Sequence, residues 1–356
     1  MSRAKILVHH DDLERFVAAA FAARGMADAD ARIIAGVLVW ANLRGGDSHG
    51  VVRVPRYLEM IEAGDMDPKA RPHFDVDAPA RFVLDARRAA GPVAMTQAIA
   101  VAIERAKTAG VCVGVVHHTT HTGAIGHYAQ TAAERGCAAI IAAAGVPLMA
   151  YHGAKVRSLS TSPLAIATPT ATRGPLVLDM ATSVAAMGRL NQARASGDPI
   201  PAGWALAEDG TPTTDPARAA IPLPIAGPKG SGLALMFELL TGVLGGAPAL
   251  VPALGAERRR RHIQNVFMLV ADIGAFRDPA AFGRDADELV DVVKHLPARD
   301  GVDEILLPGE RSRRTEAARR AGGIPIPPKT WDALSKVAGT LALKMPATLS
   351  AAEHKG

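Results

Sequence analysis

The strongest constraint on the fold is an alternation of helix and strand patterns in the first half of the chain. Helical periodicity covers residues 93–109 and stops at Gly110, and an apolar strand pattern over 111–116 follows directly. A loop rich in His, Thr and Gly comes next, then a helical pattern near 124–134 and a second strand pattern over 137–143. Because helices that alternate with strands form layered domains, we predict an α/β fold.

Helical patterns also open the chain, over about 11–25 and 28–43, and a short helix runs through Tyr57 and Met60. We therefore place an N-terminal helical segment at residues 1–75, an α/β region at 76–345 and a tail at 346–356. Further strand patterns lie at 164–167, 176–180, 265–273 and 303–307, and an apolar helix is expected at 233–244. The Pro- and Gly-rich stretch 198–228 is expected to be irregular.

The charge of the chain favours small anionic ligands over nucleic acid. Its 40 Lys and Arg residues exceed 35 Asp and Glu residues by five, partly in arginine runs at 258–261 and 311–320. No aromatic residues are interleaved with these runs, so we interpret them as solvated surface and expect no nucleic-acid partner. A modest positive field suits anionic substrates and cofactors.

Cysteine use and hydropathy indicate the cellular location. Cys112 and Cys137 both lie in strand patterns and have neither disulfide-framework nor metal-site spacing, which fits a reducing compartment. The N-terminus lacks the apolar core of a signal peptide. The longest apolar run, 137–150, is interrupted by Gly145 and Pro147 and is too short to cross a bilayer. We expect a cytoplasmic protein with no membrane partner.

The first segment that could carry chemistry reads Arg44-Gly-Gly-Asp-Ser-His-Gly-Val-Val-Arg53. A 2-oxo acid needs a cation for its carboxylate, and arginine binds that group through two parallel hydrogen bonds. It also needs a proton donor for the developing alkoxide, a role typical of histidine near neutral pH. The alternative, equally weighted, is a capped polar turn with Asp47 or Ser48 as the helix N-cap.

A second segment, from His117 to Tyr128, lies where a strand gives way to a helix, the place where open α/β folds bind ligands. Its glycines let the backbone approach a ligand closely. The segment has four histidines, which leaves a metal hydrolase as an alternative function; they are His117, His118, His121 and His127. No Asp or Glu lies among them and the bend would scatter their directions, so we expect no metal.

Two further segments resemble anion and ribose sites. Gly227-Pro-Lys229-Gly-Ser-Gly232 precedes the apolar helix and offers a lysine at a helix N-terminus. It is neither a P-loop nor Gly-x-Gly-x-x-Gly, and the latter fingerprint occurs nowhere in the chain. Asp179-Met-Ala-Thr-Ser183 ends a strand pattern, where the aspartate could accept from ribose hydroxyls or simply form a turn.

Together these segments resemble the malate/L-lactate dehydrogenase family of the non-Rossmann type, which includes ureidoglycolate, sulfolactate and Δ1-piperideine-2-carboxylate enzymes. The resemblance spans nearly the whole chain. Its motifs, in order, are the 44–53 segment with Tyr57; His121, Gly123, Gly126, Tyr128 and Ala129; Thr161-Ser-Pro163-Leu-Ala165; Asp179-Met-Ala-Thr-Ser183; Lys229-Gly-Ser-Gly-Leu-Ala-Leu; and Pro308-Gly-Glu310.

The resemblance implies a sulfolactate-dehydrogenase-like fold: a non-Rossmann mixed-sheet nucleotide-binding domain after the N-terminal helical segment. It also implies a homodimer that transfers a hydride between NAD or NADP and a small 2-oxo or 2-hydroxy acid. The implied substrate-site residues are Ser48, His49, Arg53 and Tyr57, with His121 as general acid/base. The implied cofactor contacts are His49, Gly145, Asp179, Met180, Ala181, Lys229 and Pro308. Whether His49 or His121 transfers the proton stays open on sequence alone.

The chain departs from the family pattern at three places near the expected cofactor site. It has Ala142-Ala-Ala-Gly145 where the family often has Thr-Asn, Ser162 in place of Asn, and Ser231 in place of an aromatic residue or Gln. Ser231 suggests a wider pocket and a bulkier substrate. Reduction of a cyclic imino acid such as Δ1-piperideine-2-carboxylate is the main alternative within the same fold, because both substrate classes present a carboxylate beside an sp² carbon.

Overall fold

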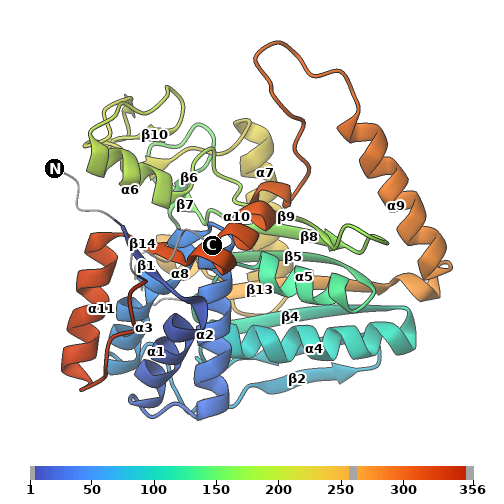
Figure 1. Cartoon of the computed structure of the whole chain (residues 1–356), viewed down its shortest axis with the longest axis horizontal. Helices are drawn as coiled ribbons and strands as arrows, with labels where there is room; N and C mark the ends of the chain where they lie inside the picture. The colour runs from blue at the N-terminus through green and yellow to red at the C-terminus, as the bar shows by residue number, and fades with distance from the viewer. Residues whose placement is uncertain (1–4, 256–262, 350–356) are drawn as a thin grey trace.

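A mixed β-sheet runs through the centre of the molecule (Figure 1), in a computed structural model that describes residues 5–255 and 263–349. Within those residues only β3 and β4 pair in parallel, and every other neighbouring pair of the sheet is antiparallel. The predicted α/β mixed-sheet fold is therefore confirmed. The strand order is β2 (His73–Ala78), β3 (Arg81–Asp85), β4 (Val111–Thr119), β13 (Gln264–Asp272), β5 (Cys137–Gly145), β8 (Leu164–Thr168) and β9 (Leu176–Met180).

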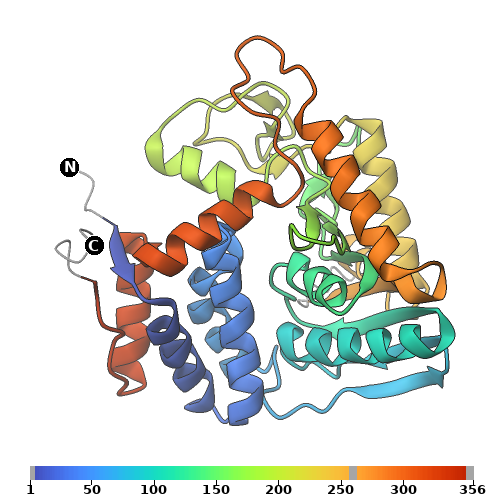
Figure 2. The ribbon, with the colours of Figure 1, turned by 45° about the vertical axis from the view of Figure 1, so that its right-hand side comes forward.

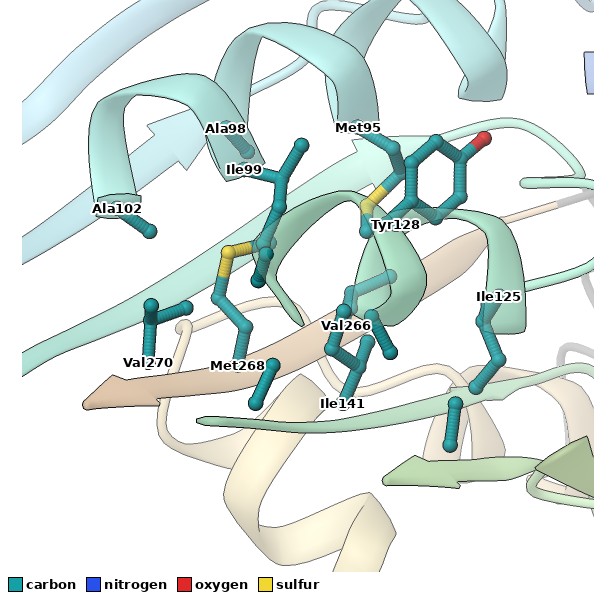
Figure 3. Packing of buried hydrophobic residues seen from close by; sticks show 14 of the residues in the cluster. Met95, Ala98, Ile99, Ala102, Ile125, Tyr128, Ile141, Val266, Met268 and Val270 are labelled. Atoms are coloured by element: carbon teal, nitrogen blue, oxygen red, sulfur yellow. The ribbon is translucent and has the colours of Figure 1, made fainter. Parts of the chain in front are cut away.

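One face of this sheet is covered by α4 (Gly91–Ala109) and α5 (Gly126–Glu134). Figure 3 shows Met95, Ile99 and Ala102, spaced at helical intervals along α4, packed against Met268 and Val270 of β13. Alternate residues of a strand point to opposite faces, so the other face needs its own cover. That cover is α7 (Pro228–Glu238) with the π-helical turn that follows it (Leu239–Val243).

The N-terminal helices form a second core with the end of the chain (Figure 2). They are α1 (His10–Ala22), α2 (Asp28–Leu43) and α3 (Val54–Glu62). Strand β1 (Ile6–Val8) pairs antiparallel with β14 (Ile324–Ile326), and α11 (Pro328–Thr340) packs into the same cluster of buried residues. The proposed domain boundaries stay a prediction, but this packing argues for adding the C-terminal elements to the first region.

Most of the remaining elements lie around the end of the sheet that follows β5 and β9, but α9 (Pro279–Lys294) packs at the opposite end, where Thr172 N of the β8–β9 turn donates to Asp287 Oδ2 at 2.9 Å. Residues 198–228, expected to be irregular, contain a small three-stranded sheet with its own apolar cluster around Leu190 and Ile200. These elements are β6 (Met149–Ala150), β7 (Arg157–Leu159), α6 (Met187–Ser196), β10 (Ala205–Leu206), β11 (Pro212–Thr213), β12 (Ile221–Pro222), α8 (Leu250–Leu254), α9 (Pro279–Lys294) and α10 (Glu310–Gly322).

The structure confirms the strand patterns that became β4, β5, β8, β9 and β13, and it corrects two others. No strand forms at 303–307, where Lys294 instead holds the segment by donating to the Ile305 carbonyl at 2.9 Å. The helix expected from 233 begins at Pro228, because a proline in the first turn needs no backbone donor. The arginine run 258–261 lies outside the described residues. Within the described chain, no helix is both long and apolar enough to span a bilayer.

Candidate active site

The 44–53 segment is folded as two short 3₁₀ turns between α2 and α3, over Asp47–His49 and Val51–Arg53. Buried Asn42 at the end of α2 organises them: its Oδ1 accepts from Val51 N at 2.8 Å and its Nδ2 donates to Asp47 Oδ1 at 2.7 Å. Arg319 of α10 donates two hydrogen bonds to the Asp47 carboxylate, at 2.6 and 3.2 Å. Asp47 thus serves as an anchor, and neither it nor Ser48 is the N-cap that the alternative interpretation required.

Substitution of Gly50 by alanine is expected to destabilise this segment. An added Cβ would lie 2.1 Å from Asn42 Oδ1, and Asn42 cannot move without giving up its bonds to Val51 and Asp47. We expect a loss of about 1–3 kcal/mol in the free energy of unfolding, as for other overpacked sites. Urea denaturation measures it, with Gly339→Ala as the control because an added Cβ there meets nothing within 4 Å. Equal midpoints for wild type and Gly50→Ala would contradict the packing argument.

Ser48, His49 and Arg53 emerge from these turns on one side. Ser48 Oγ lies 3.1 Å from His49 Nδ1, and Arg53 Nε donates to the Ser48 carbonyl at 2.6 Å. Arg53 is half-buried and has no carboxylate partner among the described residues. The start of α6 closes over the segment, since an added Cβ at Gly188 would lie 2.9 Å from Ser48 Cβ. The positive charge of the Arg53 guanidinium is therefore suited to bind an anion such as a carboxylate.

His121 lies against this cluster and is held through one ring nitrogen. Tyr57 Oη lies 2.6 Å from His121 Nδ1, and Gly123 N donates to the same nitrogen at 3.2 Å. Burial raises the pKa of the Tyr57 phenol, so Tyr57 stays a hydrogen-bond donor. The Tyr57 hydroxyl also donates to the His121 carbonyl at 3.1 Å, so Tyr57 Oη can accept from a proton on Nδ1. Both of these contacts of the His121 ring therefore use Nδ1 and not Nε2.

His49 differs from His121 in its electrostatic surroundings. The two rings are stacked, with centroids 5.4 Å apart and planes at 21°. Desolvation by the surrounding protein lowers the pKa of His49 to about 4, and the nearby charge of Arg53 adds to the shift. His49 is half-buried, so protein atoms make up much of its surroundings. His49 is thus neutral near pH 7.

The direction of the strands determines where several of the expected cofactor residues lie. Strands β4, β5 and β9 run the same way, because each pair is separated by one antiparallel strand. Their carboxyl ends therefore meet at one edge of the sheet (Figure 1), which brings His121, Gly145 and the 179–181 segment to that edge.

Backbone hydrogen bonds continue this edge to Lys229. Thr182 N donates to Thr161 O at 2.9 Å, and Ile225 N donates to Thr182 O at 2.8 Å, just before α7 begins. Lys229 lies in the first turn of α7, exposed and without an ion-pair partner among the described residues. Met180 and Ala181 are half-buried beside this path. A lysine at the N-terminus of a helix is suited to bind phosphate.

One carboxylate oxygen of Asp179 is already hydrogen-bonded within the protein. Its Oδ2 accepts from Gly126 N at the start of α5, at 3.0 Å, which leaves Oδ1 for a ligand. Desolvation by crowded surroundings raises the pKa of its carboxyl to about 6, against the hydrogen bond from Gly126 and the charge of Arg44. The residue remains exposed, so solvent moderates that shift.

Gly145 and Pro308 reach the site from separate segments. Gly145 pairs with Gln264, whose Oε1 accepts from Thr122 N at 2.8 Å and so positions the residue after His121. Pro308 precedes Gly309, whose φ of 80° and close approach to Val177 of β9 require a glycine. Gly145 thus lies beside the residue that holds the His121 segment, and Pro308 lies next to a glycine packed on the backbone of β9.

Comparison with known proteins identifies the family. The family model described as malate/L-lactate dehydrogenase matches residues 8–335. Malate dehydrogenase of Pyrococcus abyssi is 32% identical over 349 residues, which cover 95% of this chain and 96% of that protein. L-sulfolactate dehydrogenase of Methanocaldococcus jannaschii is 34% identical over 324 residues, covering 90% and 93%.

Solved structures agree with the sequence matches. Sulfolactate dehydrogenase from M. jannaschii has a TM-score of 0.88 and 32% identity, and the match covers 95% of this chain and 98% of that chain. The Δ1-piperideine-2-carboxylate reductase from Pseudomonas syringae has a TM-score of 0.81 and 28% identity, covering 93% and 99%.

The chain belongs to the malate/L-lactate dehydrogenase family. The predictions of a non-Rossmann mixed-sheet fold and of an oxidoreductase acting on the CH–OH group of small hydroxy acids are confirmed at the level of this family. The family also implies a nicotinamide cofactor.

The structure of this family member separates the four histidines of the 117–128 segment. His117 and His118 lie beside Asp75 and Asp85, whereas His127 packs edge-on against Trp40 at 5.2 Å. Burial lowers the pKa of His127 to about 4. Among the described residues the four do not form one ligand set, so the four-histidine metal hydrolase is wrong.

Sequence reasoning missed three residues that support the dehydrogenase site: Asn42, Gln264 and Arg319. Gln264 and Arg319 act on residues 142 and 272 positions away, so no local spacing signals them, whereas Asn42 acts on Asp47 and Val51, five and nine positions later. Only Asn42 carried a weak signal, as a polar residue on the apolar side of a helical pattern.

Proposed function

We propose that this dehydrogenase interconverts a small 2-hydroxy acid and its 2-oxo acid, with NAD or NADP as the hydride carrier. One observation carries the proposal: His121, oriented through Nδ1 by Tyr57, lies in one cluster with Arg53, which has no carboxylate partner among the described residues. A proton donor and a cation for a carboxylate are the two groups that this substrate class requires.

The residues of the sheet edge fit a dinucleotide. Lys229 offers a charge at a helix N-terminus, Asp179 Oδ1 offers an acceptor for a ribose hydroxyl, and Gly145 and Gly309 let backbone come close. We infer that Met180, Ala181, Pro308 and His49 add contacts along the same edge. The bound nicotinamide would supply or accept the hydride at C2 of the substrate. NAD and NADP stay alternatives.

Arg53 would bind the substrate carboxylate and fix the orientation of C2. In reduction, the doubly protonated ring of His121 would give the proton on Nε2 to the substrate oxygen, which leaves a neutral ring with its proton on Nδ1 facing Tyr57 Oη; in oxidation, that neutral ring would take the proton back at Nε2. Tyr57 would keep the ring oriented in both directions. A histidine with a pKa of about 4 is a poor acid at neutral pH, so His49 is assigned a packing and hydrogen-bonding role beside Ser48.

The experiment that tests the proposal follows the absorbance of reduced nicotinamide with NADH and then NADPH, across small 2-oxo acids and cyclic imino acids. Turnover of a 2-oxo acid supports the proposal and identifies the preferred cofactor. Turnover of a cyclic imino acid alone would replace it by the reductase alternative. Ser231 gives that alternative little support, because the side chain is buried and its Oγ accepts from His152 N at 2.8 Å instead of opening a pocket.

Replacement of Lys229 by alanine is expected to weaken cofactor binding about tenfold, the usual contribution of a hydrogen bond to a charged group. The loss should appear in the dissociation constant for NADH or NADPH, measured by fluorescence, without a change in melting temperature. Lys336→Ala, an exposed lysine on α11, is the matched control. Equal affinity of Lys229→Ala and wild type would remove Lys229 from the cofactor site.

We also infer a homodimer in the cytoplasm. The region over α7, the π-helical turn and α8 exposes large apolar side chains, which a second copy of the chain would cover. The exposed side chains are Leu235, Met236, Val243, Leu244, Val251 and Leu254. Light scattering after gel filtration tests the dimer, and a monomer would contradict it.

The inferred location in the cytoplasm rests on the cysteines. Both are buried free thiols, as suits a reducing compartment.

A further inference from the structure

A group of four side chains near the outer strands of the sheet has no part in the proposed reaction. Asp75 comes from β2, Asp85 from β3, and His117 and His118 from β4; together they form the His–Asp cluster. The sequence analysis expected no metal because no carboxylate lies among the histidines of the 117–128 segment. The sheet supplies two carboxylates from strands that precede that segment.

The contacts within the His–Asp cluster are short. His117 Nε2 lies 2.8 Å from Asp75 Oδ2, and His117 Nδ1 lies 2.9 Å from His118 Nδ1. Asp85 Oδ1 lies 3.2 Å from His118 Nδ1 and 4.0 Å from His117 Nδ1. One donor atom from each of Asp85, His117 and His118 therefore falls within 4.8 Å of the other two.

The backbone is distorted in a way that brings these groups together. Consecutive residues of a strand point to opposite faces, so His117 and His118 would ordinarily diverge. The β4–β13 register shifts between Gln264 and Val266, which leaves two residues of β4 opposite one of β13 and forms a β-bulge at the histidines. His118 takes a φ of 50°, a left-handed conformation that is uncommon for a side chain of this size.

A second bulge lies at Asp75. The β2–β3 register shifts between Phe74 and Val76, so Asp75 is the residue left without a pairing partner. Asp85 pairs directly with His117 across the parallel β3–β4 ladder, which brings both side chains to the same face. Bulges are over-represented at sheet edges and next to active sites, and backbone held in sparsely populated conformations clusters at functional sites.

The partners of His117 decide which of its two ring nitrogens carries the proton of the neutral ring. Asp75 accepts at Nε2, so the proton of the neutral ring lies there and Nδ1 presents a lone pair toward His118 and Asp85. A carboxylate that holds the far nitrogen of a histidine is the usual second partner of a metal-binding imidazole. We propose that Asp85, His117 and His118 form a site for a divalent transition-metal ion, best matched by zinc, with Asp75 orienting His117.

The donor set and its surroundings fit zinc. Two imidazole nitrogens and one carboxylate oxygen are typical of a four-coordinate zinc with one open position. Nitrogens bound to one zinc at about 2.0–2.1 Å lie about 3.3 Å apart in a tetrahedron, so His117 and His118 need to separate by only a few tenths of an ångström. His117 is almost fully buried, while His118 and Asp85 keep access to solvent.

The open position would face a pocket of about 340 Å³ beside the cluster. Its lining includes His118, Asp85, Arg87 and Arg88. His118, Arg87 and Arg88 all have a left-handed backbone conformation. Arg88 is paired with Asp65 at 3.0 Å, and Arg87 N donates to Asp85 Oδ1 at 2.8 Å, which fixes the carboxylate. The pocket has room for water or a small anion as fourth ligand, and the positive charge of Arg87 favours the anion.

The test is titration calorimetry of zinc chloride into untagged, full-length protein that has been stripped with a chelator. We expect one equivalent to bind, and His118→Asn to weaken binding at least about 10²-fold, since asparagine tolerates the left-handed backbone but removes the imidazole. His117→Ala should do the same, and Asp75→Asn should cost about 10- to 10²-fold. Thermal melting verifies that each variant used is folded.

The matched control is the double variant His9→Ala/His10→Ala, because His9, His10 and Asp11 are the other group with metal-compatible spacing among the described residues. That variant should bind zinc as the wild type does. Failure of the wild type to bind one equivalent, or unchanged binding by folded His118→Asn, would overturn the proposal. Calorimetry measures the metal alone, so either result is independent of whether the proposed dehydrogenase reaction is observed.

Discussion

His121→Ala is expected to lower kcat by about 10²- to 10⁴-fold, the usual contribution of general acid–base catalysis. The neighbouring ring cannot take over, because His49 has a pKa of about 4 and binds almost no proton at neutral pH. Steady-state kinetics in both directions measures the effect. KM for the substrate should change little, since Arg53 and not His121 is expected to bind the carboxylate.

Two further variants sharpen this prediction. Tyr57→Phe removes the hydroxyl that orients His121 Nδ1 and should reduce kcat by less than His121→Ala does, because Gly123 N still holds the ring. His295 is an exposed histidine directly after α9, and His295→Ala should leave kcat unchanged. If folded His121→Ala retained nearly full kcat, His121 would have no part in proton transfer.

Arg53→Ala is expected to lower kcat/KM by about 10- to 10²-fold, mainly through a higher KM. A hydrogen bond to a charged group contributes about 1.5–3 kcal/mol, and tenfold in a constant corresponds to about 1.4 kcal/mol. Arg53→Lys should recover part of the loss, because lysine keeps the charge but cannot form two parallel hydrogen bonds to a carboxylate.

The neighbouring Arg56 provides the control for this prediction. It is exposed on α3 and pairs with Glu59 at 3.1 Å, so Arg56→Ala removes an equal charge without touching the site. Its kinetic constants should match those of the wild type. KM values for Arg53→Ala that are unaltered across 2-oxo acids would show that another group binds the carboxylate.

Local patterns were sufficient for much of the fold, and their failures have physical causes. The periodicity of 93–109 and the apolar run after Gly110 predicted α4 and β4, because both elements bury one regular face. The run 303–307 has apolar residues that are typical of a strand, but no strand of the described sheet pairs with it. Instead, the Lys294 side chain donates to the Glu304 carboxylate and to the Ile305 carbonyl. Pairing partners are a property of the whole chain, which a local pattern does not contain.

The candidate site also contains residues that the sequence predicts and residues that it does not. Its chemistry-bearing residues, such as Arg53 and His121, are recognisable by type and motif. The residues that hold them are not, because Asp47 meets Arg319 across 272 positions of sequence. The His–Asp cluster was hidden for a further reason: two bulges reverse the directions that regular strands would give to Asp75 and His118.

The clamp of α10 on the 44–53 segment also bears on how the protein is made. Arg319 and Glu316, which hold Asp47 and Arg44, leave the ribosome some 270 residues after the segment that they complete. At roughly 5–20 residues per second, the substrate motif lacks this support for about 15–50 s, while the helices and strands between it and α10 are translated. A premature stop shortly before residue 310 would therefore yield a chain with most of its core and no working site.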